Sequence, residues 1–348
     1  MPHQQTPKHA ASGDKQPDLQ KAAPPHEQQA PAEPAAVQQL AANEPQAAQK
    51  PAEIRPVKAE PVRLRARMTL EDAFQAIGIN CVLQIEANLP GVLHKNVESL
   101  HQMRVGLRRL RALLAMFEDL AAPPVALHAS IEWLSGELGP ARDWDVLTET
   151  TLERVQGFDA AALRQAAHER AVAHHAQILF VLREPRFDEL LNQLNDWLQE
   201  RRWRADGKLA KDSPLHDRAW KGALPLLRKA EKRLAKRVDA LDETDAPARH
   251  RVRIAAKKAR YAAEFFRDLL PARRVKRYVG HLEQVQDQLG LLNDLAVAEQ
   301  LLEELKGGNS QVAKQAAYVR GYVAASAEAN VQGLGKSLKS VARRRITK

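Results

Sequence analysis

Two short segments of the sequence repeat one pattern of histidine, arginine and lysine. Residues 101–111 read HQMRVGLRRLR, and residues 250–260 read HRVRIAAKKAR. Both fit H-x-x-R-x-x-x-[RK]-[RK]-x-R, at a separation of 149 residues. Arginine binds phosphate oxygens through two parallel hydrogen bonds, and lysine supplies a compact positive charge. The pattern therefore predicts a site for phosphate groups or another oxyanion.

Helical geometry places four side chains of each motif on one stripe. Successive residues of an α-helix are turned by about 100°, so the four fall within roughly an 80° arc. The stripes are His101, Arg104, Arg108 and Arg111 in the first motif, and His250, Arg253, Lys257 and Arg260 in the second. A neighbouring apolar stripe is expected to face a helical core. Arg109 and Lys258 project off the basic stripes, and we expect them to make a different contact.

Neither motif contains an acidic residue. Like charges four residues apart destabilise a helix by a few tenths of a kcal/mol per pair, so we expect bound oxyanions to neutralise these cations. Histidine, with an unperturbed pKa of about 6.5, becomes cationic beside phosphate, which predicts tighter binding on mild acidification. His101 and His250 could instead act as general bases. That alternative needs a nucleophile, and the motifs contain no serine, cysteine or carboxylate.

A second motif follows each copy of the first. Residues 138–146 read LGPARDWDV and residues 289–297 read LGLLNDLAV, which both fit L-G-x-x-[RN]-D-x-x-V at a separation of 151. Two motifs in the same order and at nearly the same offset predict that the folded part arose by duplication of one unit. The halves are expected at about residues 69–203 and 214–340.

The aspartates of the second motif allow two interpretations. Asp143 and Asp294 cap a helix or brace an arginine, and we expect a bracing role for both of them and for Arg142. The alternative is a metal site that also uses Asp145 and Glu149, but the second copy has alanine at the position of Asp145. Three further histidines are interpreted as surface residues because no ligand set surrounds them: His168, His174 and His175. We predict no metal and no cofactor.

The elements that position these motifs are predicted to be helices. Apolar residues recur at spacings of three and four from Met68 onward, prolines or glycines interrupt the pattern, and no strand is evident. The expected fold is all-α, with two pseudo-two-fold-related helical bundles, each a four-helix unit. Helices are predicted at 69–89, 94–120, 125–138, 141–156, 159–183, 186–203, 214–241, 246–269, 273–289, 292–306 and 310–340. The role of the stretch 186–203 is not evident from the sequence.

Charge and composition separate a tail from this helical part. Residues 1–61 hold eleven of the twenty prolines and show no hydrophobic periodicity, so they are predicted to be a disordered Pro/Ala/Gln-rich tail. The net charge of +10 comes from the remainder, because residues 1–60 have six basic and seven acidic residues. Such a basic body, residues 62–340 with a basic end at 341–348, predicts a polyanionic partner.

A further basic face lies on the predicted helix 214–241. Residues 228–237 read RKAEKRLAKR, which is either a solvated face or a secondary anion contact. The candidate residues are Arg228, Lys229, Lys232, Arg233 and Lys236. No apolar run approaches the eighteen or so residues of a membrane span, and no secretory signal is visible. The single cysteine, Cys81, fits a reducing compartment, so we expect a cytoplasmic protein.

The paired motifs, in this order, resemble the CHAD family, the conserved histidine α-helical domain, over roughly residues 69–340. The resemblance implies two four-helix bundles related by a pseudo-two-fold axis, with basic surfaces around a central cleft or pore. It also implies binding of inorganic polyphosphate and association with polyphosphate granules. Carried over by position, the implied binding residues are His101, Arg104, Arg108, Arg109, Arg111, His250, Arg253, Lys257, Lys258 and Arg260. Many relatives have an N-terminal triphosphate-tunnel domain with an E-x-E-x-K motif, which this sequence lacks, so we expect a stand-alone member.

We therefore predict a non-catalytic polyphosphate-binding protein located on polyphosphate granules. The alternatives are a nucleic-acid-binding protein, an adaptor on the surface of another storage granule, and a phosphohydrolase that uses one histidine. The basic stripes lack interleaved aromatic residues for base stacking, and the sequence has no helix-turn-helix or zinc-finger spacing. These features favour polyphosphate over nucleic acid.

Overall fold

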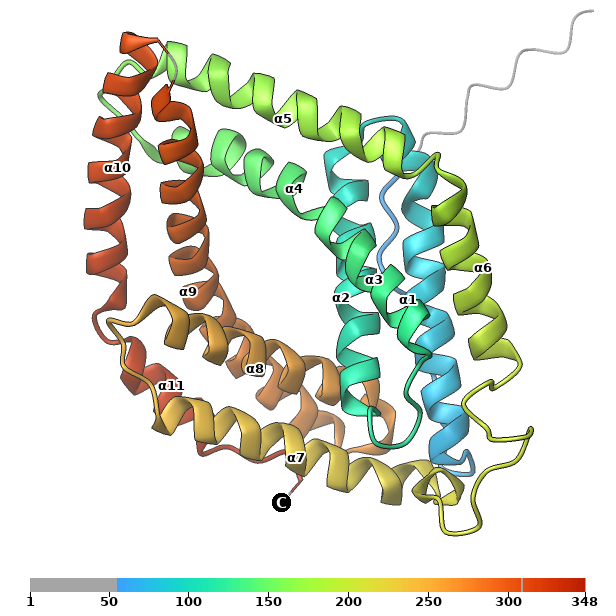
Figure 1. Cartoon of the computed structure of the whole chain (residues 1–348). Helices are drawn as coiled ribbons and strands as arrows, with labels where there is room; N and C mark the ends of the chain where they lie inside the picture. Colours follow the sequence, from blue (N-terminus) through green and yellow to red (C-terminus); the bar gives the residue numbers. More distant parts are fainter. Residues whose placement is uncertain (1–54, 308, 348) are drawn as a thin grey trace, which may run out of the picture. The chain divides into compact units, whose positions relative to one another are not determined.

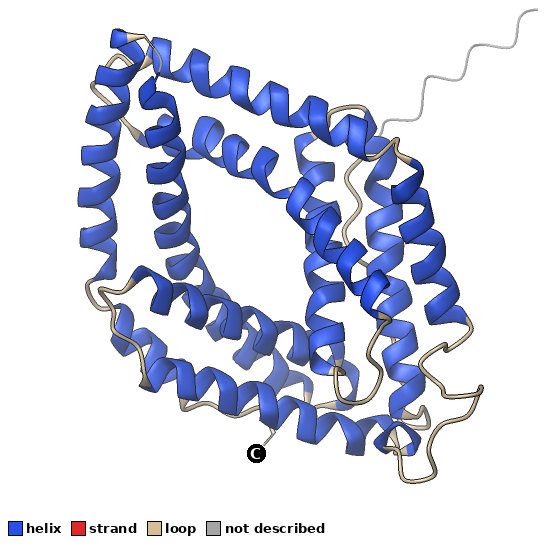
Figure 2. Ribbon diagram, viewed as in Figure 1, coloured by secondary structure: helices blue, strands red, loops and turns tan. Residues whose placement is uncertain are grey.

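Helices form nearly all of the regular structure. The computed structural model describes residues 55–307 and 309–347, and within these ranges there is no β-strand (Figures 1 and 2). The prediction of an all-α fold is thus confirmed. The helices are α1 (Leu70–Leu93), α2 (Val97–Met116), α3 (Val125–Glu137), α4 (Gly139–Val146), α5 (Ala161–Val181), α6 (Pro185–Gln199), α7 (Ala219–Asp239), α8 (Ala246–Phe265), α9 (Ala272–Glu304), α10 (Ser310–Val331) and α11 (Leu334–Ala342).

Local capping fixes where the two motif helices begin. The side chain of Asn96 accepts a hydrogen bond from the backbone of Ser99 (2.8 Å) at the start of α2. The side chain of Asp245 accepts one from the backbone of Ala248 (3.0 Å) at the start of α8. Both caps satisfy backbone N–H groups that have no partner within the helix. Each cap lies five residues before the histidine of its motif, so the two basic stripes begin at the same depth of their helices.

Two predicted boundaries of the second half are wrong. The helices expected at 273–289 and 292–306 are one continuous helix, α9, which passes through Gly290. A glycine inside a helix costs only about 1 kcal/mol relative to alanine, and α9 packs against α8 and α10, which offsets that cost. The helix expected at 310–340 is instead divided into α10 and α11 at Gly333, whose φ of 81° ends the helical turn.

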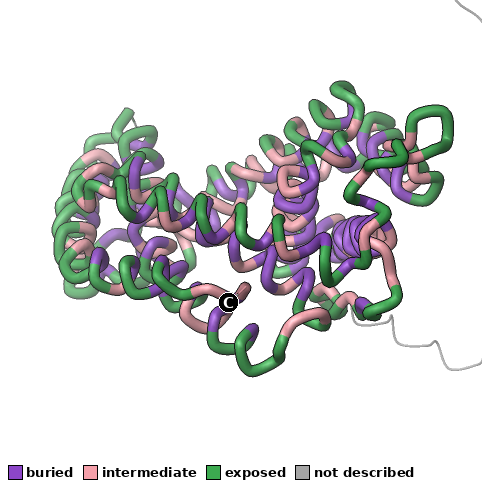
Figure 3. The backbone as a smooth tube through the Cα atoms, turned by 90° about the horizontal axis from the view of Figure 1, so that it is seen from below, coloured by how far each residue is buried: buried purple, intermediate pink, exposed green. Residues whose placement is uncertain are grey.

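The helices contact one another in a closed circuit within the compact unit Glu53–Lys348 (Figure 1). α2 contacts α8, α8 contacts α9, α9 contacts α10, α10 contacts α5, α5 contacts α4, and α4 returns to α2. The buried hydrophobic side chains form two cores. Figure 3 shows along the backbone which residues are buried. The smaller core joins α4 and α5 of the first half to α9 and α10 of the second. Because the larger core also draws on both halves, neither core belongs to one half alone. Duplication and the pseudo-two-fold axis stay predictions.

α1 forms the centre of the larger core. By length and mean hydropathy, α1 is the one helix among those described that could cross a membrane, but buried helices of soluble proteins meet the same criterion. It packs against α2, α6 and α7. The stretch 186–203, whose role the sequence left open, supports α1. Trp197 packs edge-on against Phe74 of α1. Trp203 and the next residue, Arg204, both donate hydrogen bonds to the buried carboxylate of Glu71 (2.8 Å each).

The predicted tail lies largely outside the described residues, which begin at residue 55. The part that is described, residues 55–61, is not helical and runs along α1. Asn88 of α1 accepts from the backbone N–H of Val57 (2.9 Å) and donates to its carbonyl (2.8 Å). Asn80 donates to the carbonyl of Glu60 (2.9 Å). These contacts attach the last residues of the predicted tail to the helical unit.

The close approach of α1 and α2 at Gly106 can be tested by substitution. A Cβ at Gly106 would lie 3.0 Å from Ile85 Cγ1 and 3.2 Å from the backbone oxygen of Cys81. We expect Gly106→Val to destabilise the fold by about 1–3 kcal/mol, because the branched side chain must push α2 away from α1. Urea unfolding measures the change. Gly136→Val is the matched control, because nothing lies within 4 Å of a Cβ at that position of α3. An equal loss in both variants would contradict the proposed contact.

Candidate functional site

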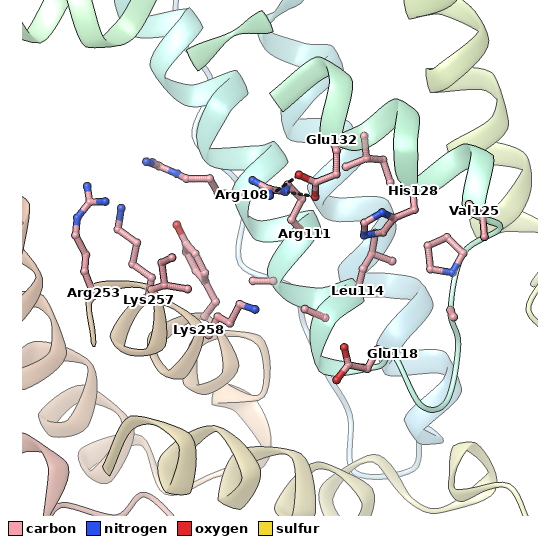
Figure 4. Close-up of a pocket in the computed structure, with 17 residues that line it drawn as sticks. Arg108, Arg111, Leu114, Glu118, Val125, His128, Glu132, Arg253, Lys257 and Lys258 are labelled. Atoms are coloured by element: carbon pink, nitrogen blue, oxygen red, sulfur yellow. Dashed lines mark hydrogen bonds and ion pairs between the residues drawn. The ribbon is translucent and has the colours of Figure 1, made fainter. Parts of the chain in front are cut away.

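The two basic stripes meet at one place. α2 contacts α8, and Arg108 of α2 lines the same cavity as Arg253 and Lys257 of α8. In Figure 4 these three side chains extend into the same region between the two helices. Arg104, one turn before Arg108, lies beside the first turn of α4, where a Cβ at Gly139 would be 3.6 Å from its Nη1. We name Arg104, Arg108, Arg253 and Lys257 the basic cluster.

Carboxylates of the second motif lie next to the basic cluster. The charge of Asp143 in α4 interacts with Arg104 and Arg253, which belong to different motif helices. Asp294 in α9 interacts with Arg253 and Lys257. Burial raises the pKa of Asp143, and the negative charge of Asp294 acts in the same direction. The second motif thus supplies negative charge that neutralises part of the first.

This placement distinguishes between the two interpretations of the aspartates. Asp143 lies inside α4 and Asp294 inside α9, so neither residue is the N-cap of its helix. The capping interpretation is therefore wrong, whereas the electrostatic contacts with arginines fit a bracing role. Arg142 adds positive charge near His101 and near Asp143. In the part of the chain that the structure describes, no group of three or more His, Cys, Asp or Glu side chains could hold a metal ion.

The cations of the cluster are held in unfavourable surroundings. Burial lowers the pKa of Arg104 to about 10, although Asp143 partly opposes this shift. Burial also lowers the pKa of Lys257 to about 7, and repulsion by Arg253 and Arg108 adds to the effect. The Nε atoms of Arg108 and Arg253 are buried and have no hydrogen-bond partner within residues 55–307 and 309–347. An oxyanion would supply the missing negative charge, and its oxygens would accept hydrogen bonds from the outer N–H groups of the guanidinium ions.

The far ends of the stripes are neutralised by neighbouring helices. Arg111 donates to both carboxylate oxygens of Glu132 in α3 (2.7 and 2.6 Å). Arg260 pairs with Glu264 of its own helix (3.4 Å) and with Glu283 of α9 (3.5 Å). These two arginines thus already have carboxylate partners, and binding of an oxyanion by them stays a prediction. No feature of the sequence links Glu132 to Arg111, because the contact depends on the packing of α3 against α2.

Arg109 points away from the basic cluster, as the helical geometry predicts, whereas Lys258 lines the same cavity as Arg108, Arg253 and Lys257. Arg109 donates to Gln84 and Asn80 of α1 (2.8 Å each), so its guanidinium ties α2 to α1. Lys258 interacts with the charge of Arg233 on α7, and burial together with that charge lowers its pKa. Direct binding of polyphosphate by Arg109 and Lys258 stays a prediction.

The two motif histidines lie at the N-terminal ends of the stripes. Nδ1 of His250 is 3.1 Å from Oδ1 of Asn293, which joins the first and second motifs of this half. Burial lowers the pKa of His101, and the positive charges of Arg108 and Arg142 act in the same direction. His101 is therefore more often neutral in the free protein than an exposed histidine, and a bound anion would favour its protonation.

The basic face of α7 is exposed. All five candidates for a secondary anion contact lie on it: Arg228, Lys229, Lys232, Arg233 and Lys236. Lys229 is paired with Asp119 (2.8 Å). Arg233 lies near Lys258, which connects this face with the second motif helix. The residues are thus accessible to a long polyanion, and their role in binding stays a prediction.

One buried pair was missed by the sequence reasoning. Nε2 of His175 in α5 is 2.8 Å from Oδ1 of Asp145, whose side chain is 4% exposed. The interpretation of His175 as a surface residue is wrong, because the packing of α4 on α5 buries it against this carboxylate. The charge of Asp145 also acts on Arg104. The spacing of 30 residues between the two partners gives no signal in the sequence.

Comparisons with known proteins agree with this arrangement. The CHAD domain family matches residues 76–303. A crystal structure of the CHAD domain from the plant Ricinus communis is 35% identical with a TM-score of 0.76, and the match covers 84% of this chain and 98% of that chain. The structure of PptA from Streptomyces chartreusis has a TM-score of 0.60 at 18% identity, over 79% of this chain and 100% of that one, which is a likeness in fold. No curated protein sequence matches significantly. The family match spans more than half of the sequence and includes the helices that contain the repeated motifs. This chain therefore belongs to the CHAD domain family.

Proposed function

We propose that this protein binds inorganic polyphosphate at the basic cluster without catalysing a reaction on it. The observation that carries the proposal is the convergence of Arg104 and Arg108 from α2 with Arg253 and Lys257 from α8. These side chains present several positive charges over a short distance, with buried N–H donors that have no acceptor among the described residues. A chain of linked phosphates offers matching charges and acceptors at regular intervals.

The surroundings of the cluster favour binding over catalysis. The titratable groups that act on it besides its own cations include Asp143, Asp145, Asp294, His101 and Tyr261. A phosphohydrolase would need a positioned nucleophile or an activated water, and we assign neither role to any of these residues. We further propose that polyphosphate binding directs the protein to polyphosphate granules in the cytoplasm. The exposed cations of α7 would then extend the contact along a long chain.

The first test removes one arginine from each motif helix. We expect Arg108→Ala/Arg253→Ala to weaken binding of long-chain polyphosphate by at least about tenfold, and to lower the slope of log affinity against log salt by about two. Filter binding at several salt concentrations measures both quantities. Lys208→Ala/Lys211→Ala removes the same charge from the exposed loop after α6 and is the matched control. Equal losses in both double variants would show that net charge, and not the cluster, determines binding.

The second test concerns pH. The pKa of Lys257 is about 7 in the free protein because of burial, and Arg253 of α8 and Arg108 of α2 lower it further against the opposing charge of Asp294 on α9. Bound phosphate stabilises the charged amine of Lys257 and therefore raises its pKa. Binding above pH 7 is thus accompanied by the uptake of a proton by Lys257. We expect affinity to rise up to about tenfold as pH falls from 8.5 to 7, and the part of the rise due to Lys257 to level off below about pH 6, where its amine is almost fully charged.

Two variants separate Lys257 from other titrating groups. Lys257→Arg keeps the positive charge throughout this range and should flatten the pH dependence above pH 7 while affinity at pH 6.5 is retained. Lys257→Met should weaken binding at pH 6.5 to the level of the wild-type protein at high pH. Isothermal titration calorimetry in two buffers of different ionisation enthalpy measures the proton uptake. An unchanged pH profile in Lys257→Arg would contradict the assignment.

A competition experiment separates polyphosphate from nucleic acid. The cluster cations are only partly exposed between helices, so a thin flexible chain can reach them more easily than a rigid duplex. We expect long-chain polyphosphate to displace double-stranded DNA of equal total charge at physiological salt, and DNA to displace polyphosphate poorly. Gel-shift competition in both directions measures this. Ready displacement of polyphosphate by DNA would instead support a nucleic-acid-binding protein.

A further inference from the structure

A cavity of about 640 Å³ opens beside the basic cluster between α2, α3, α8 and the loop that joins α2 to α3 (Figure 4). Its volume is in the range of pockets that hold small organic ligands. At one end lie Arg108, Arg253 and Lys257, three members of the basic cluster. This end therefore has the same chemistry as the proposed polyphosphate site.

The cavity wall also has an apolar part. It consists of short and branched aliphatic side chains, which are Ala112, Leu114, Ala115, Ala122, Pro123, Val125, Ile131 and Ile254, together with Tyr261. The polar residues Arg111, Glu118, His128, Glu132 and Lys258 complete the lining. Two of these side chains are unusually exposed for their type, Val125 at 88% and Ile254 at 41%. In Figure 4, Val125 and Leu114 lie on the opposite side of the cavity from Arg253 and Lys257. Inorganic polyphosphate has no apolar part that could cover this wall.

The cations around the cavity come mainly from one helix. Arg253, Lys257 and Lys258 of α8 all line it, together with Arg108 of α2. Arg111 is already bound to Glu132, and Glu118 at the end of α2 is paired with Lys229 (3.7 Å). A phosphate group is thus attracted to the side of the cavity that α8 and Arg108 form.

We propose that this cavity binds a small organic phosphate, with its phosphate groups at the basic cluster and its apolar body against the exposed side chains of Val125 and Ile254. The proposal rests on the proposed function, because both ligands use the same cations. It adds that a small organic phosphate and polyphosphate compete for the protein. The apolar body is either the ring system of a nucleotide or an alkyl chain, and both share the chemistry of a phosphate joined to an apolar group.

The test compares organic phosphates with inorganic ligands that carry the same phosphate group. Binding of ATP is compared with that of inorganic tripolyphosphate, and binding of octyl phosphate with that of inorganic phosphate, all without divalent metal. We expect at least one organic ligand to bind roughly tenfold tighter than its inorganic match, which corresponds to about 60 Å² of newly buried apolar surface. Isothermal titration calorimetry measures the four affinities, and long-chain polyphosphate is titrated in parallel. The ATP and octyl phosphate arms distinguish a ring from an alkyl chain.

Two variants locate the effect. Ile254→Asn removes an exposed part of the apolar wall and should abolish the advantage of the organic ligand while affinity for polyphosphate is unchanged. Leu83→Asn, at an exposed apolar position of α1 that does not line the cavity, is the matched control and should leave all affinities unchanged. An organic advantage that survives Ile254→Asn, or that is lost equally in Leu83→Asn, would overturn the assignment of the ligand to this cavity.

The possible failures are distinguishable. If polyphosphate binds but neither organic ligand exceeds its inorganic match, the cavity proposal is wrong and the proposed function stands. If an organic ligand binds in an Ile254-dependent manner and polyphosphate does not bind, the proposed function is wrong and the cavity proposal stands on its own. If none of the ligands binds, both proposals are overturned.

Discussion

The structure depends on the four partly buried cations of the basic cluster, which lie close together. Arg104 and Arg108 of one helix and Arg253 and Lys257 of another repel one another, and burial adds a cost for each charge. The protein offsets this cost with Asp143 and Asp294, which come from two further helices, and with stable cores that fix all four backbones. The remaining imbalance is visible in the lowered pKa of Lys257 and in the buried Nε atoms of Arg108 and Arg253, which are unpaired within the described ranges. A site with this imbalance favours an anionic ligand.

The two hydrophobic cores hold the motif helices together against the repulsion among the four cations. Each hydrophobic core combines helices from both sequence halves, so the two motif helices cannot separate without disturbing a core. α1 is central to this arrangement, because α2 approaches it closely at Gly106 and is also tied to it by Arg109. A residue of the basic motif thus serves the packing of its own helix. The same motif contains ligand-facing and structural cations, which differ only in the side of the helix from which they project.

The sequence alone identified the fold class, the motif helices and most of the cations that line the site. Apolar periodicity predicted the helices, and the repeated His/Arg/Lys motif identified the cations. The motif helices also begin at local caps, Asn96 and Asp245, which act on residues close to them in the sequence. The helical phase also separated Arg109 and Lys258 from the stripes before any tertiary contact was known. The errors arose where packing overrides local preference: α9 continues through Gly290 because α8 and α10 hold it.

What the sequence by itself determined was thus a pair of basic helix faces, each with a neighbouring apolar face. Only the tertiary structure decided that the two faces meet, that Glu132 and Glu283 neutralise their far ends, and that an apolar cavity opens beside the shared centre. The physical reason is that a helix face is set by residues three and four positions apart, whereas these contacts join residues that are tens to more than a hundred positions apart. Their charges interact only after the cores have brought the helices together.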